Sequence, residues 1–183
     1  ETEEALVAFL ESREETEEAL VAFLESSRLD PNHVDSHYQA GLIYEQKDQI
    51  DLAIERYETV ISLDQTQAEP FLRLGKIYHD RNEDDNVIRV WVPGLALSPN
   101  HPKKQYKLGA IFENRDRRVQ AIKHFGLANQ YDPSNYDWQF RYARLLDRHA
   151  QTVEDYNQHA GMAMEAYTAT IQLKPYASAY FFR

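Results

Sequence analysis

The sequence contains no cysteine, so disulfides and thiolate metal sites are excluded. It is also poor in residues that interrupt helices, with six glycines and seven prolines among 183 residues. No run of about 18 apolar residues is present, and the chain opens on acidic residues, not on a signal peptide. We therefore expect no direct membrane insertion and, without a signal peptide, a cytoplasmic location. Since an initiator methionine is also missing, we expect the chain to be part of a longer protein.

A basic excess is missing as well. The formal net charge is −10, and much of it lies in residues 1–28, which hold nine glutamates and two arginines. The other residues hold 21 acidic and 18 basic side chains, so their charges nearly balance. Binding to nucleic-acid phosphates requires a clear excess of Lys and Arg. We therefore expect no nucleic-acid partner.

Catalytic signatures are absent too. The sequence has no HExxH, no glycine loop for phosphate, no Gly-x-Ser-x-Gly and no cysteine nucleophile. The seven histidines are scattered. His33 and His37 are four residues apart, which suits a metal pair on a helix, but His33 follows Pro31 closely, where a solvent-facing turn residue is expected. The sequence predicts a protein that is not an enzyme, with no cofactor and no metal site.

What the sequence does contain is an internal repeat of 34 residues. A column of small residues recurs at this spacing, and an aromatic or leucine follows three positions later in each copy. The small-residue column consists of Gly41, Gly75, Gly109 and Ala143. A second aromatic column consists of Tyr57, Trp91 and Phe125. Most copies close on a hydrophobic residue followed two positions later by proline, as in Leu29-Asp30-Pro31 and Tyr131-Asp132-Pro133.

Each repeat is predicted to be a pair of helices. Large residues fall at helical spacing, for example Ile50, Ile54 and Tyr57. A small residue in the glycine column allows two helices to approach closely, and the closing proline cannot continue a helix interior. The resulting hairpin has one apolar face that must stack on its neighbours.

A 34-residue unit with these columns resembles the tetratricopeptide repeat, and the resemblance covers roughly residues 15–183. It implies an all-α fold, an α-solenoid of stacked antiparallel helix hairpins in a right-handed superhelix of about five repeats. We expect one repeat domain over residues 1–183. Its units are 1–33, 34–67, 68–101, 102–135 and 136–177, with 178–183 as the start of a truncated helix.

Three segments depart from the repeat. Pro93-Gly94 falls inside a predicted second helix, where proline costs about 3 kcal/mol, so a kink or early break is expected there. About eight extra residues enter around Arg148–Gly161, which a longer turn or longer helices would absorb. Residues 1–12 recur unchanged at 15–26, for which we favour one continuous helix. Both copies would share an apolar stripe made of Leu6, Phe9, Leu10, Leu20, Phe23 and Leu24.

The exposed faces of the first helices are the predicted binding site. In tetratricopeptide arrays these faces line a concave groove that holds peptides or helices, and here they carry cations beside aromatic residues. Arginine offers bidentate pairing to carboxylates, and aromatic side chains supply contact area. The alternative is that these cations pair with Glu and Asp of adjacent helices. The predicted groove residues are Tyr38, Arg73, Lys76, Tyr106, Lys107, Phe140, Arg141 and Arg144.

The predicted function is a non-catalytic scaffold or adaptor that binds an acidic peptide or helix of a protein partner. The carboxylate clamp of chaperone-binding tetratricopeptide domains is not predicted, because only Lys103 and Lys107 match its pattern. Two alternatives are self-association into a dimer or filament through the duplicated N-terminal stripe, and the repeat region of a larger enzyme. A third is a small-molecule site around Trp91 and Pro93.

Overall fold

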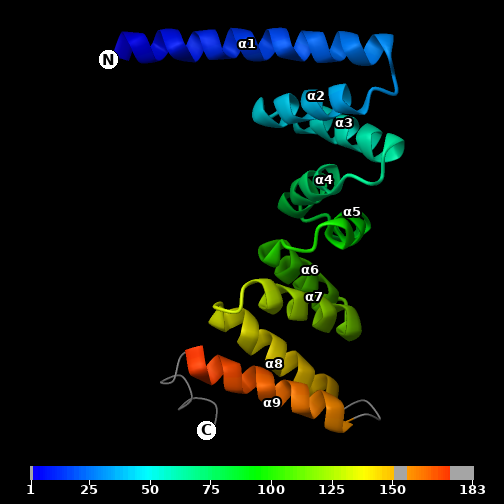
Figure 1. The fold of residues 1–183 in the computed structure, drawn as a ribbon, viewed down its shortest axis with the longest axis vertical. Helices are drawn as coiled ribbons and strands as arrows, with labels where there is room; N and C mark the ends of the chain where they lie inside the picture. The colour runs from blue at the N-terminus through cyan, green and yellow to red at the C-terminus, as the bar shows by residue number, and fades with distance from the viewer. Residues whose placement is uncertain (1, 151–155, 174–183) are drawn as a thin grey trace. The chain divides into compact units, whose positions relative to one another are not determined.

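The computed structural model describes residues 2–150 and 156–173, and the side chains of residues 14–150 and 160–173. Within these residues the chain forms nine α-helices and no strands (Figure 1). The all-α, helical-repeat prediction is therefore confirmed. The helices are α1 (Thr2–Leu29), α2 (Val34–Gln46), α3 (Ile50–Leu63), α4 (Ala68–Asp80), α5 (Asp84–Leu97), α6 (Pro102–Asn114), α7 (Arg118–Tyr131), α8 (Tyr136–Ala150) and α9 (Tyr156–Leu173).

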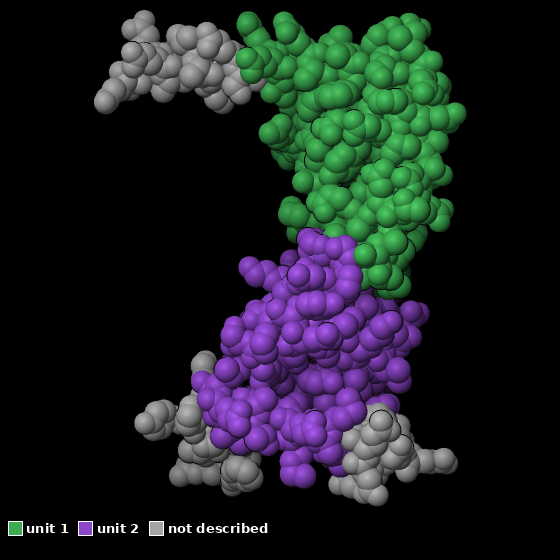
Figure 2. All heavy atoms as spheres, viewed as in Figure 1, with its two compact units in different colours: residues 1–97 green, residues 98–183 purple. Residues whose placement is uncertain are grey.

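The helices divide into two compact units, which are coloured separately in Figure 2. Unit 1 spans Glu1–Leu97 and contains α1 to α5, and unit 2 spans Ser98–Arg183 and contains α6 to α9. Inside each unit every helix packs on the next one along the chain. The pairs α2–α3, α4–α5, α6–α7 and α8–α9 are the hairpins, and their first helices begin 34 residues apart.

The glycine column sets how closely the two helices of a hairpin approach. A Cβ atom built on Gly41 would lie 2.8 Å from the Tyr57 ring, and one on Gly109 would lie 2.8 Å from Phe125. At Gly75 the distance to Trp91 would be only 2.2 Å. Each aromatic ring is buried against the glycine of the facing helix. The two columns recognised in the sequence are therefore the two sides of one contact.

The turns inside the first three hairpins have the same conformation. Asp48, Asn82 and Asp116 lie 34 residues apart and have positive φ angles of 58°, 58° and 54°. In each turn the following residue donates its N–H to the carbonyl five positions earlier, at 2.9 Å, as Gln49 does to Tyr44. This Schellman geometry satisfies carbonyls at the end of the first helix, and glycine usually occupies its left-handed position.

The junctions between hairpins use two further polar contacts. The carboxylates of Asp30, Asp64 and Asp132 accept the N–H two residues on, at 3.0, 2.9 and 3.3 Å. At the start of the next helix a buried side chain reaches the carbonyl six residues earlier. His37 Nε2 lies 3.0 Å from Pro31 O, and Gln105 Nε2 donates to Pro99 O at 3.1 Å. Gln139 makes the same contact with Pro133. These bonds fix the entry of each first helix.

Of the kink or early break expected at Pro93, the break is wrong, because α5 continues through this residue to Leu97. The residues on both sides of Pro93 are held against α4: Trp91 Nε1 donates to Leu72 O at 3.2 Å, and Gly94 is buried against Phe71. We attribute the continuity to this packing, which outweighs the roughly 3 kcal/mol cost of an interior proline.

The N-terminal duplication forms one helix, as favoured from the sequence, since α1 runs unbroken from Thr2 to Leu29. In the last hairpin both helices are lengthened: α8 has 15 residues and α9 has 18, against 13 for α2 and 14 for α3. The segment between them, 151–155, and the expected helix start at 178–183 lie outside the described residues.

Candidate functional site

In unit 1 the predicted binding residues meet around a carboxylate, Glu45. Tyr57 donates its hydroxyl proton to Glu45 Oε2 at 2.8 Å, and Arg73 Nη1 approaches the same oxygen at 3.2 Å. Tyr38 lies beside this cluster, with its ring centroid 6.1 Å from that of Tyr57. Burial and the hydrogen bond to Glu45 together raise the pKa of Tyr57, so the phenol stays protonated and remains a donor.

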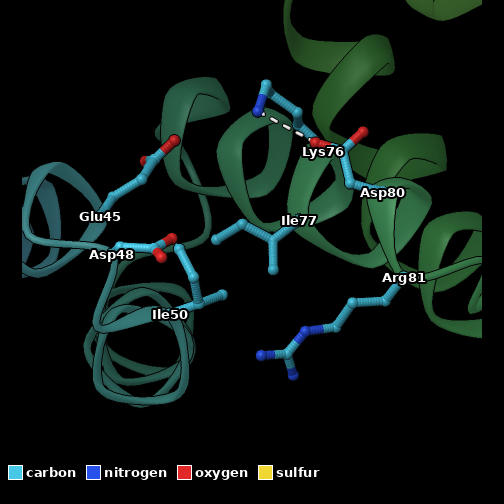
Figure 3. Close-up of a pocket in the computed structure, with 7 residues that line it drawn as sticks. All are labelled: Glu45, Asp48, Ile50, Lys76, Ile77, Asp80 and Arg81. Atoms are coloured by element: carbon cyan, nitrogen blue, oxygen red, sulfur yellow. Dashed lines mark hydrogen bonds and ion pairs between the residues drawn. The ribbon is translucent and has the colours of Figure 1, made fainter.

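A pocket of about 390 Å³ opens next to this cluster, between the C-terminal ends of α2 and α4 (Figure 3). The Ile50 and Ile77 side chains lie at its centre, among charged groups. Lys76 Nζ is paired with Asp80 Oδ2 at 3.1 Å, one helical turn away. The residues that line it are Glu45, Asp48, Ile50, Lys76, Ile77, Asp80 and Arg81.

In unit 2 the same arrangement recurs two repeats further along the chain. Arg141 Nε donates to Glu113 Oε2 at 2.8 Å, and its Nη1 donates to the Tyr106 hydroxyl at 3.1 Å. The guanidinium lies over two rings, 5.5 Å from the Tyr106 centroid and 5.2 Å from that of Phe125. Burial acts to lower the pKa of Arg141, but the bonds to Tyr106 and Glu113 raise it overall. This arginine is charged and fixed in place.

A pocket of about 370 Å³ adjoins Arg141 on the face of α6 and α8. It is lined by Glu113, Phe140, Arg141, Arg144 and Arg148. Arg148 Nη2 donates to Glu113 Oε1 at 2.8 Å, so each oxygen of this one carboxylate already accepts from an arginine. Arg144 lies over the Phe140 ring, 5.6 Å from its centroid. Among the described residues, no carboxylate forms an ion pair with Arg144.

The two pockets therefore differ in charge. In unit 2 one carboxylate faces three arginines, which leaves a surplus of two positive charges. In unit 1 three carboxylates face two cations, and both cations are neutralised, Lys76 by Asp80 and Arg81 by Asp51 at 2.8 Å. Only the unit 2 pocket offers an arginine head group, that of Arg144, that no carboxylate in the described part of the chain occupies.

The predicted groove residues are thus divided between the two units. Tyr38, Arg73 and Lys76 lie together in unit 1, and Tyr106, Phe140, Arg141 and Arg144 lie together in unit 2. Lys107 is exposed on α6 and lines neither pocket. The alternative interpretation, pairing with acids of adjacent helices, describes two of the five cations, Arg73 and Arg141. Lys76 is paired as well, but with Asp80 of its own helix.

The sequence analysis missed the acids that organise both clusters, Glu45 and Glu113, and the third arginine, Arg148. A signal for the acids existed, because Glu45 and Glu113 occupy the same column of the repeat, seven residues after Tyr38 and Tyr106. Arg148 follows Arg144 by four residues, so it continues the same helical face by one more turn.

The N-terminal stripe is described only in its second copy. Leu20 is buried, and Phe23 and Leu24 are half-buried in α1, which packs on α2. Side chains of the first copy, including Leu6, Phe9 and Leu10, lie outside the described residues. In the part of the chain that was described, no helix has the length and apolar character to cross a membrane, and no group of three or more His, Asp or Glu forms a metal-binding cluster.

Comparison with known proteins decides the repeat type. Residues 34–67, which contain α2 and α3, match the tetratricopeptide repeat family. This chain carries a tetratricopeptide repeat. No curated protein matches the sequence. The resemblance proposed from the glycine and aromatic columns is therefore confirmed at the repeat that begins with Val34.

Solved structures of three proteins share the helical fold of this chain. YrrB, described as a TPR protein with an unusual peptide-binding site, is 19% identical, with a TM-score of 0.63 over 92% of this chain and 82% of YrrB. MamA from Desulfovibrio magneticus RS-1 is 18% identical, with a TM-score of 0.58 over 94% and 93% of the two chains. PilF from Pseudomonas aeruginosa is 18% identical, with a TM-score of 0.54 over 91% and 72%. At these identities the likeness concerns the fold.

Proposed function

We propose that this tetratricopeptide-repeat chain is a non-catalytic interaction scaffold that binds an acidic peptide or helix of a partner protein. The first-helix faces carry the binding residues, and the pocket between α6 and α8 in unit 2 is the centre of the site. The observation that carries the proposal is the charge of this pocket, where three arginines surround a single carboxylate.

The chemistry of the pocket suits a carboxylate ligand. Arg144 presents a planar guanidinium that can bind a carboxylate with two parallel hydrogen bonds. The Phe140 ring beneath Arg144 restricts the side chain, so less conformational entropy is lost on binding. Arg141 and Arg148 already share Glu113, and both line the same pocket. A ligand with acidic side chains would add the carboxylates that the pocket lacks.

The fold supports a peptide or helix as the ligand class. Stacked helical repeats present extended surfaces built from successive first helices, and such surfaces are used for protein binding. YrrB, which shares this fold, is described as having a peptide-binding site. Tyr106, Phe140 and Trp138 add aromatic area to the charged face, and Tyr106 and Trp138 stack with their ring centroids 4.9 Å apart.

The test uses a synthetic peptide of alternating Glu and Leu, with a Lys–Leu peptide of the same length as the comparison. We expect the full chain to bind the acidic peptide and not the basic one in isothermal titration calorimetry. Arg144→Glu should weaken this binding roughly tenfold, or about 1.4 kcal/mol. Lys123→Glu, the same charge reversal at an exposed site on α7, is the matched control. Equal affinities for both peptides, or equal losses in both variants, would contradict the proposal.

Self-association through α1 is a second candidate, favoured by the continuity of α1 across both copies of the duplicated segment. A helix that carries the same apolar pattern twice can present one face to a second chain. Light scattering at several protein concentrations should then show a mass above 21.4 kDa. Replacing Leu6 and Phe9 with Ser would restore the monomer. A monomer at all concentrations would exclude this candidate.

A further inference from the structure

We infer that one position of the repeat, occupied by Asp80 in unit 1 and Arg148 in unit 2, determines whether a repeat pocket accepts an acidic ligand. This inference rests on the proposed function of the unit 2 pocket and identifies the residue that gives the pocket its selectivity. The two residues are equivalent, since each lies seven residues after the arginine that pairs with Glu45 or Glu113.

The surroundings of this position are the same in both units. Glu45 and Glu113 are equivalent, and each accepts from an arginine of the following repeat, Arg73 or Arg141. Their side chains are similarly covered, 22% and 17% exposed. Four residues before the position stands a cation in both units, Lys76 or Arg144. The scaffold around the position is therefore common, and the residue at the position differs in sign.

The charge of the residue at this position determines whether the cation four residues earlier is neutralised. In unit 1 Asp80 lies 3.1 Å from Lys76 and neutralises it one helical turn away. In unit 2 this position is occupied by Arg148, which forms an ion pair with Glu113 at 2.8 Å. Arg148 thus does two things: it adds a positive charge to the pocket, and it leaves Arg144 without a carboxylate partner among the described residues. An acidic ligand would supply that partner.

Exchanging the two residues should exchange the selectivity. Asp80→Arg changes the net charge of the unit 1 pocket from −1 to +1 and removes the ion-pair partner of Lys76. Arg148→Asp changes the net charge of the unit 2 pocket from +2 to 0 and provides an internal partner for Arg144. Both positions are more than half exposed. They also lie in the last turns of α4 and α8, so neither change disturbs the core. At a helix C-terminus Asp80→Arg is moreover favourable for the helix dipole.

The chain provides one reporter in each unit for this test. It has two tryptophans: Trp138 stacks on Tyr106 beside the unit 2 site, and Trp91 stacks on His79, next to Asp80, with ring centroids 5.6 Å apart. Their indole N–H signals in a ¹⁵N–¹H correlation spectrum report separately on the two units. The probe is the alternating Glu–Leu peptide, added to the 183-residue chain.

In the unaltered chain the peptide should shift the Trp138 signal and leave Trp91 in place. Arg148→Asp should lower the affinity for the peptide, followed at the Trp138 signal, roughly five- to tenfold. Asp80→Arg should cause the peptide to shift the Trp91 signal. Arg148→Lys, which keeps the charge, should retain most of the affinity. If the unaltered chain gives no Trp138 response, the proposed function itself fails. If it responds but Arg148→Asp binds equally well, or Asp80→Arg adds no response at Trp91, the selectivity inference fails.

Discussion

Units 1 and 2 are built on the same repeat, yet their pockets have opposite charge. Both contain a tyrosine, a half-buried glutamate and an arginine in equivalent places: Tyr38, Glu45 and Arg73 in one, Tyr106, Glu113 and Arg141 in the other. The difference lies at the edge of the cluster, where Asp80 is replaced by Arg148. The two units keep the packing and the central ion pair of the repeat and reverse the charge at one exposed position, to which we ascribe the proposed difference in binding preference.

The largest expected effect comes from substitutions that disrupt the glycine–aromatic contact present in both units. Gly75→Ala in unit 1 would place a Cβ 2.2 Å from the Trp91 ring, which is buried and cannot retreat, so we expect a loss of about 2–3 kcal/mol of unfolding free energy. Gly109→Ala faces Phe125 at 2.8 Å and should cost less. Gly161→Ala, with no atom within 4 Å, is the control and should stabilise α9 by about 0.5–1 kcal/mol. Urea unfolding measures all three, and an equal response at Gly75 and Gly161 would contradict the close contact.

The stability of the chain should depend on pH through a histidine of unit 2. His124 is buried there, and burial, with a smaller contribution from Lys123, lowers its pKa from 6.5 to about 4. Its Nδ1 lies 2.7 Å from Gln105 Oε1, and Gln105 Nε2 donates to Pro99 O, so Nδ1 carries the proton of a neutral ring. In unit 1 the position equivalent to His124 is occupied by Arg56, which lies beside His37.

The direction of this pH effect depends on whether the folded or the unfolded chain binds the proton of His124. Between pH 6.5 and 4 the unfolded chain protonates His124 and the folded chain does not, so stability is present above pH 6.5 and is lost as the pH falls towards 4. From pH 7.5 to 5 we expect this histidine to contribute a loss of about 1–2 kcal/mol. His124→Asn retains a donor to Gln105 and does not titrate. Urea unfolding at the two pH values should show a smaller loss in the variant, and an unchanged loss would show that His124 is not responsible.

The smallest expected effect concerns the turns. Asp48 and Asp116 hold positive φ angles that glycine adopts without strain, so Asp48→Gly should stabilise unit 1 by about 1 kcal/mol. Asp116→Gly should gain a few tenths less, because Asp116 is paired with Arg118 at 2.9 Å. Thermal unfolding of the two variants compares the turns directly. A lower melting temperature for Asp48→Gly would mean that its carboxylate stabilises the turn more than the strain costs.

The sequence was sufficient for the hairpins because their determinants recur at fixed spacing. Gly41 and Tyr57, like Gly109 and Phe125, are small and large partners in one contact, and a 34-residue period makes such partners visible. The left-handed turn residues were not visible, because Asp and Asn stand where glycine is usual. The helix through Pro93 was mispredicted because the cost of a proline is local, whereas the burial of Trp91 and Gly94 against α4 is tertiary.

The candidate site was predictable only in part, for the same reason. Helical spacing indicated which side chains share a face, such as Arg141 and Arg144. It could not indicate which of these cations are already neutralised, since Glu113 meets Arg141 from a different repeat, 28 residues away. Arg148 was not predicted because it lies one helical turn beyond Arg144, the last of the predicted groove residues.

The most direct measurement is the location of a bound acidic peptide on the unaltered 183-residue chain. A Glu–Leu peptide with a photoreactive group at its centre would be cross-linked and the adducts mapped by mass spectrometry. We predict adducts on α6 and α8, around Phe140 and Arg144, which an excess of unlabelled acidic peptide removes and the Lys–Leu peptide does not. Adducts divided equally between α8 and α4 would contradict the assignment of acidic-ligand binding to the unit 2 pocket.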